Sequence, residues 1–139
     1  MVITSEDVRF KLTDIWGDLK DIWLRNKKYI SPTQQELQNA LDKFNYSNLP
    51  VIPGFNECEN FSLFLHSDIK KYGVSEDQNY NWAFGDFICK KTTTFQGVRV
   101  HSANICICQD DIYIIEPMYN NTVSIADKNK YDIFFVNMC

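Results

Sequence analysis

The stretch PVIPGFNECENFSLFL, residues 50–65, predicts the central helix of this fold and the reactive group at its start. Its two prolines and its glycine favour a loop, and the apolar residues that follow recur at helical spacing, so the loop leads directly into a helix. Cys58 lies where that helix begins. Unpaired backbone N–H groups and the positive end of the helix dipole favour a thiolate at such a position. The stretch therefore predicts a nucleophilic thiol.

Length and composition favour one globular domain. The chain has 139 residues, of which 45% are hydrophobic and 14% aromatic, which is enough to bury a core without disulfides or metals. We expect a single domain over residues 1–139, with residues 1–28 as a helical segment packed on it. The net charge of −4, without a Lys/Arg cluster, argues against a nucleic-acid partner. No apolar run reaches the roughly 20 residues of a membrane span.

The N-terminus and the cysteines favour a cytoplasmic protein. Residues 1–7 turn acidic at once and lack the basic and apolar regions of a signal peptide. The cysteines are odd in number, which predicts free thiols rather than a disulfide framework. They are Cys58, Cys89, Cys106, Cys108 and Cys139.

Helical patterns occupy the N-terminal half. A first helix is expected to begin at Thr4 or Ser5. Its apolar stripe contains Val8, Leu12, Ile15, Leu19 and Ile22. Residues 31–34 predict the start of a second helix, with a capping hydroxyl at Ser31 and with Gln34 completing a capping box, and this helix should end near Asn45. The central helix extends from about Asn56 to a stop at Gly73.

Strand patterns fill the C-terminal half, and helices followed by strands are typical of an α+β fold. The expected strands cover residues 82–89, 97–108, 112–116 and 132–136. They should form an antiparallel sheet packed on the central helix. We expect Cys108 to pair with Asp111 across a two-residue turn. This register sets Ala103 opposite Glu116, and it places His101 on the same face, one diagonal step from Glu116.

Cys58, His101 and Glu116 have the chemistry of a thiol-based catalytic triad. Glu116 can accept a hydrogen bond from one ring nitrogen of His101, while the other nitrogen takes the proton of Cys58. The backbone N–H of Cys58, at the helix start, is suited to stabilise an oxyanion. The candidates for the second oxyanion donor are Asn56 and Gln34, followed by Asn48 and Gln35.

The order of these residues resembles the papain-like cysteine peptidases: a cysteine at a helix start, a histidine 43 positions later and a hairpin carboxylate 15 further on. The similarity is closest to the compact papain-like domain at the C-terminus of certain fungal lectins, where the third residue is Glu. The wider transglutaminase-like group shares the order. The resemblance extends from Tyr29 to Val136, and residues 54–61 are its most specific motif. It implies a papain-like α+β fold in which Cys58 is the nucleophile, His101 the general base and acid, and Glu116 the residue that orients the imidazole.

The predicted function is that of a thiol hydrolase, a cysteine peptidase or amidase that acts on a protein or peptide through a thioester. A transglutaminase-like acyl transfer passes through the same acyl-enzyme and differs in the acceptor. The alternative is a catalytically idle scaffold that acts as a protein-binding module or inhibitor. This alternative is motivated by the short chain and by residues 49–55, which contain no glutamine where papain-type enzymes carry an oxyanion glutamine. We expect no cofactor and no metal.

Three other polar features have simpler interpretations than catalysis. Cys106 and Cys108 share one strand face, but a zinc site needs a second ligand pair. The acidic turn at residues 109–111 has the oxygen ligands that calcium prefers, yet it fits a solvated hairpin tip better. His66 lies about 12 Å along the helix from Cys58. It is therefore too distant to be the base and is expected to be a solvated helix residue.

Overall fold

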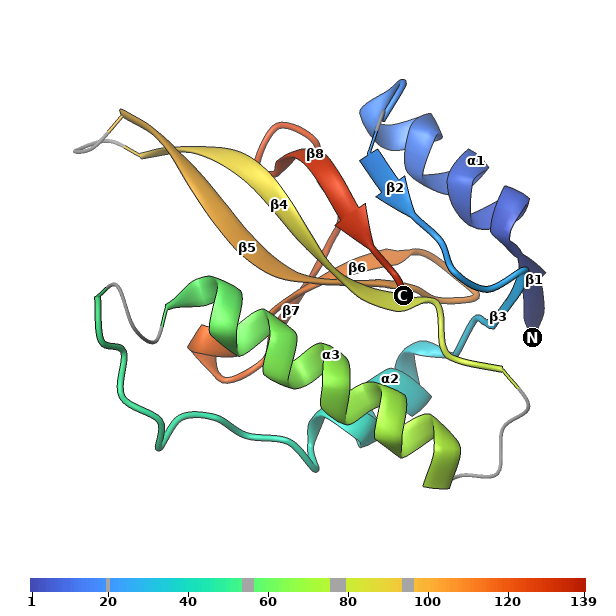
Figure 1. Ribbon diagram of the computed structural model, residues 1–139, viewed down its shortest axis with the longest axis horizontal. Helices are drawn as coiled ribbons and strands as arrows, with labels where there is room; N and C mark the ends of the chain where they lie inside the picture. Colours follow the sequence, from blue (N-terminus) through green and yellow to red (C-terminus); the bar gives the residue numbers. More distant parts are fainter. Residues whose placement is uncertain (20, 54–56, 76–79, 94–96) are drawn as a thin grey trace.

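A computed structural model describes residues 1–19, 21–53, 57–75, 80–93 and 97–139 (Figure 1). Helix α1 (Ser5–Trp16) covers one face of a central sheet, and helices α2 (Gln34–Leu41) and α3 (Cys58–Ser75) lie on the other face. Helices and a mixed but mainly antiparallel sheet coexist in one fold. The expected α+β class is therefore confirmed.

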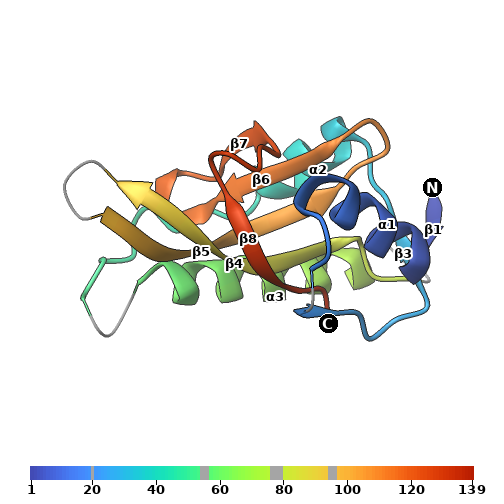
Figure 2. The ribbon, with the colours of Figure 1, turned by 90° about the horizontal axis from the view of Figure 1, so that it is seen from above.

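The central sheet has six strands among the described residues, in the order β2-β8-β4-β5-β6-β7. The expected strands are present as β4 (Phe84–Thr93), β5 (Gly97–Ile107), β6 (Ile112–Glu116) and β8 (Asp132–Asn137). The prediction lacks β2 (Asp21–Trp23), β7 (Thr122–Ile125) and a small separate sheet of β1 (Val2–Thr4) with β3 (Lys28–Ile30). Neighbouring strands are antiparallel, apart from the parallel pair of β2 and β8. Figure 2 shows α3 along the side of β4 and β5, and α2 near β6.

The hairpin of β5 and β6 has the predicted register. The N–H of Cys108 donates to the carbonyl oxygen of Asp111 at 2.9 Å, and the ladder that follows keeps the expected pairing throughout. A one-residue slip would move each side chain to the other face. Because the register is kept, His101 and Glu116 lie on the same face, as predicted.

Both faces of the sheet are buried. Ile105 packs in the cluster that contains Val8 and Leu12 of α1, and its neighbour Cys106 packs in the cluster that contains Leu65 of α3. Alternate residues of a strand point to opposite faces. The unbroken apolar run in β5 therefore reflects a strand that is covered by helices on both sides.

Helix α1 is shorter than its apolar stripe predicts. Thr4 caps it in a capping box with Asp7, over distances of 3.1 Å and 2.8 Å. The helix ends at Trp16, because Gly17 has a φ of 73°, which a helix does not allow. Ile22 was expected on this helix and instead lies in β2. Residues 1–28 are therefore not one helical segment.

Helix α2 begins two residues later than a Ser31 cap would give. Thr33 is the cap: its hydroxyl accepts from the N–H of Glu36 at 3.0 Å, and the Glu36 carboxylate accepts from the N–H of Thr33 at 3.2 Å. The prediction that Gln34 completes the capping box is wrong, because Glu36 occupies the third helical position. The helix also ends earlier than predicted, at Leu41.

Helix α3 places its predicted apolar stripe against the sheet, with Phe61, Leu65 and Ile69 buried. Gly73 does not end it, since the helix continues to Ser75. The helix begins at Cys58 and contacts both β5 and the short 3-10 helix η1 (Pro117–Tyr119) that follows β6. This packing holds the first turn of α3 beside the end of β6.

Candidate active site

Cys58 is the first residue of α3 and is half-buried. The side chain of Asn60 turns back and accepts a hydrogen bond from the N–H of Glu57 at 3.2 Å, which secures the helix start. The first N–H groups of a helix have no intrahelical acceptor. The backbone N–H of Cys58 is thus available in principle for an oxyanion. The other expected donor, Asn56, lies outside the described residues.

His101 and Glu116 form the close contact that the register predicts. Nε2 of His101 lies 2.8 Å from Oε2 and 3.0 Å from Oε1 of Glu116. The β5–β6 ladder stops before Pro117 turns the chain away into η1. His101 therefore lies in the part of β5 that is not paired with β6. At the opposite edge of β5, it pairs with Cys89 of β4.

His101 and Cys58 line the same two pockets, and the Cys58 side chain contributes to the pKa of His101. Sγ of Cys58 itself donates a hydrogen bond to Oε2 of Glu59 at 3.6 Å. Because Nε2 is engaged by Glu116, Nδ1 is the ring nitrogen left for the thiol. Burial acts to lower the pKa of His101, but the Cys58 side chain, the hydrogen bond to Glu116 and the charge of Glu116 outweigh it and raise the pKa to about 9. The imidazole is therefore protonated at neutral pH and stands between an anionic carboxylate and the thiol.

Glu116 is buried, with 6% of its surface exposed, and it remains ionised. Burial acts to raise its pKa, yet the hydrogen bond and positive charge of His101 and a hydrogen bond from Tyr131 hold the pKa below its usual value. The Tyr131 hydroxyl donates to Oε1 of Glu116 at 2.8 Å. No local pattern in the sequence predicts this role of Tyr131, because it lies just before β8 and meets Glu116 only through the pairing of the sheet.

Cys89 is a second thiol beside His101, and it is unsuited to nucleophilic attack. It pairs with His101 across β4 and β5 and is fully buried. Burial, followed by the charge of Glu116, raises the pKa of its thiol to about 12. Cys89 therefore stays protonated at neutral pH, and Cys58 is the thiol that the site presents.

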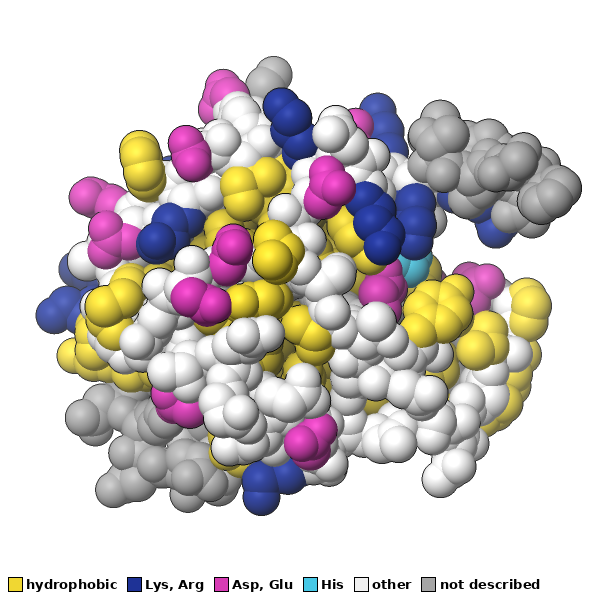
Figure 3. Space-filling model, turned by 180° about the vertical axis from the view of Figure 1, so that it is seen from behind, with side chains coloured by type: hydrophobic (Ala, Val, Ile, Leu, Met, Phe, Trp, Pro, Cys, Tyr) yellow, Lys and Arg dark blue, Asp and Glu magenta, His cyan; other side chains and the backbone are white. Residues whose placement is uncertain are grey.

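Two pockets open beside Cys58 and His101, and both side chains line each pocket. The first, which we call the Arg99 pocket, has a volume of about 400 Å³ and is bordered by Lys91 and Arg99. The second, the Asp86 pocket, has a volume of about 390 Å³ and extends along α3 toward Asp86. Figure 3 shows Lys and Arg side chains gathered beside a histidine surface on this side of the molecule. The thiol thus has space on two sides.

Gln34, the second expected oxyanion donor, is not brought to this site. It is exposed in the first turn of α2. Neither the Arg99 pocket nor the Asp86 pocket includes it among the described residues that line them. The triad residues are therefore assembled by the fold, whereas Gln34 is not.

His66 is buried rather than solvated, which corrects the expectation for this residue. Its Nδ1 lies 2.6 Å from Oδ1 of Asp86, and Asp86 also accepts from the side-chain amide of Asn137 at 3.2 Å. The turn of α3 that carries His66 packs on β4, where Asp86 lies. The sequence gives no sign of this pairing, because the two residues are on different elements.

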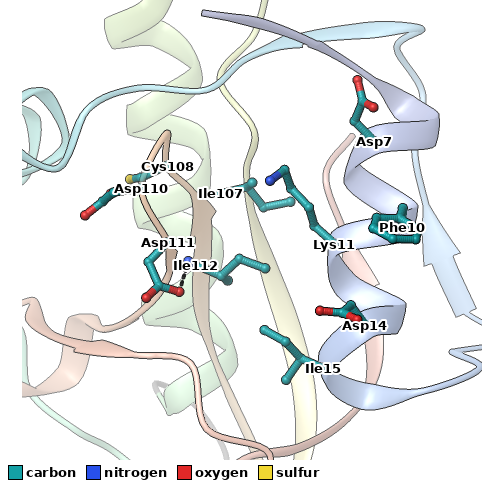
Figure 4. A pocket seen from close by; sticks show the side chains of 10 residues that line it. All are labelled: Asp7, Phe10, Lys11, Asp14, Ile15, Ile107, Cys108, Asp110, Asp111 and Ile112. Carbon is teal, nitrogen blue, oxygen red and sulfur yellow. Dashed lines mark hydrogen bonds between the residues drawn. The ribbon is translucent and has the colours of Figure 1, made fainter.

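A third pocket, of about 390 Å³, lies between α1 and the β5–β6 hairpin (Figure 4). Two of its carboxylates serve the backbone: Asp7 belongs to the α1 capping box, and Oδ1 of Asp111 accepts from the N–H of Ile112 at 2.8 Å. Within the described ranges, no group of three or more His, Cys, Asp or Glu side chains is arranged to hold a metal ion. Cys106 and Cys108 lie 3.8 Å apart at sulfur in the core.

No protein-family model matches this chain, and no curated protein matches it in sequence. Its fold is similar to that of PSL1a, the lectin of Polyporus squamosus, in a complex with E64, with a TM-score of 0.79 and 18% identity over 98% of this chain and 50% of that one. It is also similar to the Polyporus squamosus lectin bound to a human-type influenza-binding epitope, Neu5Aca2-6Galb1-4GlcNAc, with a TM-score of 0.78 and 16% identity over 98% of this chain and 49% of that one. The chain thus spans about half the length of the solved structures it matches, and it shares the fold of that portion of a fungal lectin.

Proposed function

We propose that this chain is a thiol hydrolase of the cysteine peptidase or amidase type, built as a single papain-like domain, in which Cys58, His101 and Glu116 form a catalytic triad. The observation that carries the proposal is the position of His101, which contacts the buried Glu116 carboxylate through Nε2 and lines the same two pockets as Cys58. A protonated imidazole between a carboxylate and a thiol is the arrangement that activates a cysteine nucleophile.

In the reactive state of the proposed reaction, Nδ1 of His101 holds the proton of the Cys58 thiol. The thiolate Sγ attacks the carbonyl carbon of an amide, and the carbonyl oxygen becomes an oxyanion beside the N–H groups at the start of α3. The proton held on Nδ1 of His101 passes to the leaving nitrogen as the C–N bond breaks, which leaves a thioester on Cys58. His101 then takes a proton from water, the hydroxide attacks the thioester, and the acid leaves as the thiolate forms again. Glu116 stays ionised and holds the imidazole in place.

An amine that replaces water as the acceptor would convert the same thioester into a new amide, as in a transglutaminase-like transfer. The exposed setting of the site supports either acceptor, because Val100 at its rim is 68% exposed. The free state of the five cysteines supports the expected cytoplasmic setting, in which thiols stay reduced. The described residues contain no helix that is both long and apolar enough to cross a membrane.

The second candidate function is a binding module that uses the papain-like scaffold without catalysis. The similar structures are those of a lectin, one of them bound to a sialylated trisaccharide, and this observation favours recognition of a glycan or a protein. The names of the similar structures thus support binding, whereas the arrangement of Cys58, His101 and Glu116 supports hydrolysis. Because the chain matches half of those proteins, the sugar contact in them can belong to either half.

The two functions separate in one experiment with matched variants. Denatured casein is incubated with the parent chain, with Cys58→Ala and with Cys139→Ala, a half-buried cysteine that lines neither pocket among the described residues. The hydrolase proposal expects cleavage by the parent and by Cys139→Ala and none by Cys58→Ala. Absence of cleavage by all three, together with binding of the trisaccharide by both the parent and Cys58→Ala in calorimetry, would instead support the binding module.

A further inference from the structure

The Asp86 pocket has both apolar and polar lining. Leu63, Ile88 and Val100 contribute apolar walls. Ser62, Ser102 and Asp86 line it as well, and the two hydroxyls hydrogen-bond to each other at 2.8 Å. Glu59 and His101 line it beside Cys58, so a ligand there meets hydrocarbon together with hydrogen-bonding and acidic groups.

Asp86 presents a negative charge to this pocket. Both hydrogen bonds that Asp86 makes among the described residues fall on Oδ1, from His66 and Asn137, so Oδ2 keeps its lone pairs. Nε2 of His66 is buried without a hydrogen-bond partner among the described residues. The described residues that line this pocket include a second carboxylate, that of Glu59, and no Lys or Arg; the imidazole of His101, already paired with Glu116, lines it beside Cys58.

We propose that the Asp86 pocket selects the substrate of the proposed hydrolase by binding a basic side chain, Lys or Arg, next to the amide that Cys58 attacks. This inference rests on the proposed function, because it takes the bound side chain to be part of the substrate of the hydrolase. The aliphatic stem packs on Leu63, Ile88 and Val100, and the cationic head reaches Asp86 and the two serine hydroxyls.

The length of the pocket favours a long side chain over a short one. Cys58 and Asp86 both line the pocket, and so does Ser62, which lies one helical turn, about 6 Å, along α3 from Cys58. A long side chain that enters beside Cys58 extends past this first turn, whereas a short one does not. A long side chain without a charged head would fill the same walls, but it would remove water from Asp86 and the serine hydroxyls without replacing their hydrogen bonds.

Direct binding tests this inference without any need for turnover. N-acetyl-lysine methylamide and N-acetyl-norleucine methylamide have the same stem and differ in the ammonium group. Each is titrated into the nitrogen-15-labelled parent chain, and the amide signals of Leu63, Ile88 and Ser102 are followed. We expect the lysine compound to bind at least about ten-fold more tightly than the norleucine compound. Equal affinities, or no shift of these signals with either compound, would overturn the inference.

Three variants sharpen the test. Asp86→Asn keeps an oxygen acceptor for His66 and Asn137 but removes the charge, and should reduce the preference to about two-fold or less. Leu63→Lys, at a position 52% exposed in the pocket wall, should weaken binding of the lysine compound while the fold stays intact. Ile125→Lys, at a position 59% exposed on β7, adds the same charge elsewhere and should leave binding unchanged. If Asp86→Asn and Leu63→Lys both keep the parent's preference for the lysine compound over the norleucine compound, the lysine compound binds outside the Asp86 pocket and the inference is overturned.

Turnover then separates this inference from the proposed function. The anilides of the same two acetylated amino acids are offered to the parent chain and to Asp86→Asn. If the lysine compound binds preferentially but neither anilide is cleaved, the Asp86 pocket recognises a basic side chain and the hydrolase proposal is contradicted. If both anilides are cleaved at equal kcat/KM, the hydrolase proposal is supported and the selectivity of the Asp86 pocket is contradicted.

Discussion

The hydroxyl of Tyr131 donates a hydrogen bond to Oε1 of Glu116 over 2.8 Å, and so links the start of β8 to the end of β6 directly behind His101. Both side chains are buried. Burial and the hydrogen bond to Glu116 raise the pKa of Tyr131, so it remains a donor throughout the physiological range. Glu116 thereby receives hydrogen bonds from two directions, which fixes the carboxylate that orients His101.

Replacement of Tyr131 by phenylalanine should loosen this carboxylate. We expect Tyr131→Phe to lower the free energy of unfolding at pH 7 by about 1 to 2 kcal/mol, the usual loss for one hydrogen bond to a buried charged group. The pKa of Glu116 should rise, because the tyrosine hydrogen bond lowers it. The acid limb of any pH profile of Cys58 reactivity should therefore move to higher pH.

Tyr113→Phe is the matched control for this prediction. Tyr113 also donates to a carboxylate, that of Asp110 at 2.7 Å, but Asp110 is exposed at the hairpin tip. Urea unfolding of both variants should show a small change for Tyr113→Phe and the larger loss for Tyr131→Phe. Equal losses, or an unchanged acid limb in Tyr131→Phe, would mean that Tyr131 does not support Glu116.

The raised pKa of His101 predicts how stability depends on pH. Folding raises the pKa from 6.5 to about 9, so the stabilisation by the protonated ring is complete below pH 6.5 and is lost as the pH rises through 9. At about 1.4 kcal/mol per pKa unit, a shift of this size corresponds to at most about 3.4 kcal/mol, and solvent screening reduces it to roughly 2 to 3 kcal/mol. The lowered pKa of Glu116 acts oppositely: its contribution is complete above pH 4.5 and is lost as the pH falls. The pair should therefore stabilise the fold most between pH 4.5 and 6.5.

Urea unfolding at pH 6 and pH 9.5 checks this prediction. The parent chain should lose stability between the two values, and His101→Gln should lose about 2 kcal/mol less. His66→Gln removes the other histidine and should keep the slope of the parent. A slope that persists in His101→Gln would assign the pH dependence to groups other than this pair.

Two glycines predict opposite effects of the same substitution. Gly73 lies inside α3, and a methyl group there would have its nearest neighbour at 4.0 Å, so Gly73→Ala should stabilise the protein by about 0.5 to 1 kcal/mol. Gly85 lies in β4, where a methyl group would stand 2.1 Å from the carbonyl oxygen of Asn137. Gly85→Ala should therefore destabilise the protein by several kcal/mol, on the order of 3. Thermal unfolding of both variants measures this, and a destabilising Gly73→Ala would argue that α3 ends there.

The parts of the site that the sequence predicts are those set by local chemistry and by one turn. The pairing of Cys108 with Asp111 determines the register of a hairpin, and the register alone brings His101 to Glu116. The position of Cys58 follows from the loop that precedes it and the apolar spacing after it. Such features depend on neighbours within a few residues or on a single strand pairing.

The parts that it misses depend on contacts between distant elements. Ile22 continues the apolar spacing of α1, but the helix ends at Gly17. Ile22 instead lies in β2, which pairs with β8 and completes the same buried face. His66 and Asp86 meet because α3 packs on β4. Helical periodicity reports that a face is buried, and it does not report which partner covers it. The same limit explains why Tyr131 has no signature in the sequence.

The central claim, that His101 activates Cys58, is tested most directly by the rate at which iodoacetamide alkylates Cys58 between pH 5.5 and 9, with the label located by mass spectrometry. The parent is compared with His101→Gln and, as the matched control, His66→Gln. An ordinary thiol is only about 1% thiolate at pH 6.5. At this pH the parent and His66→Gln should react at least about ten-fold faster than His101→Gln. Slow alkylation that is the same in all three proteins would mean that His101 does not activate Cys58, and that Cys58 is a packing residue at the start of α3.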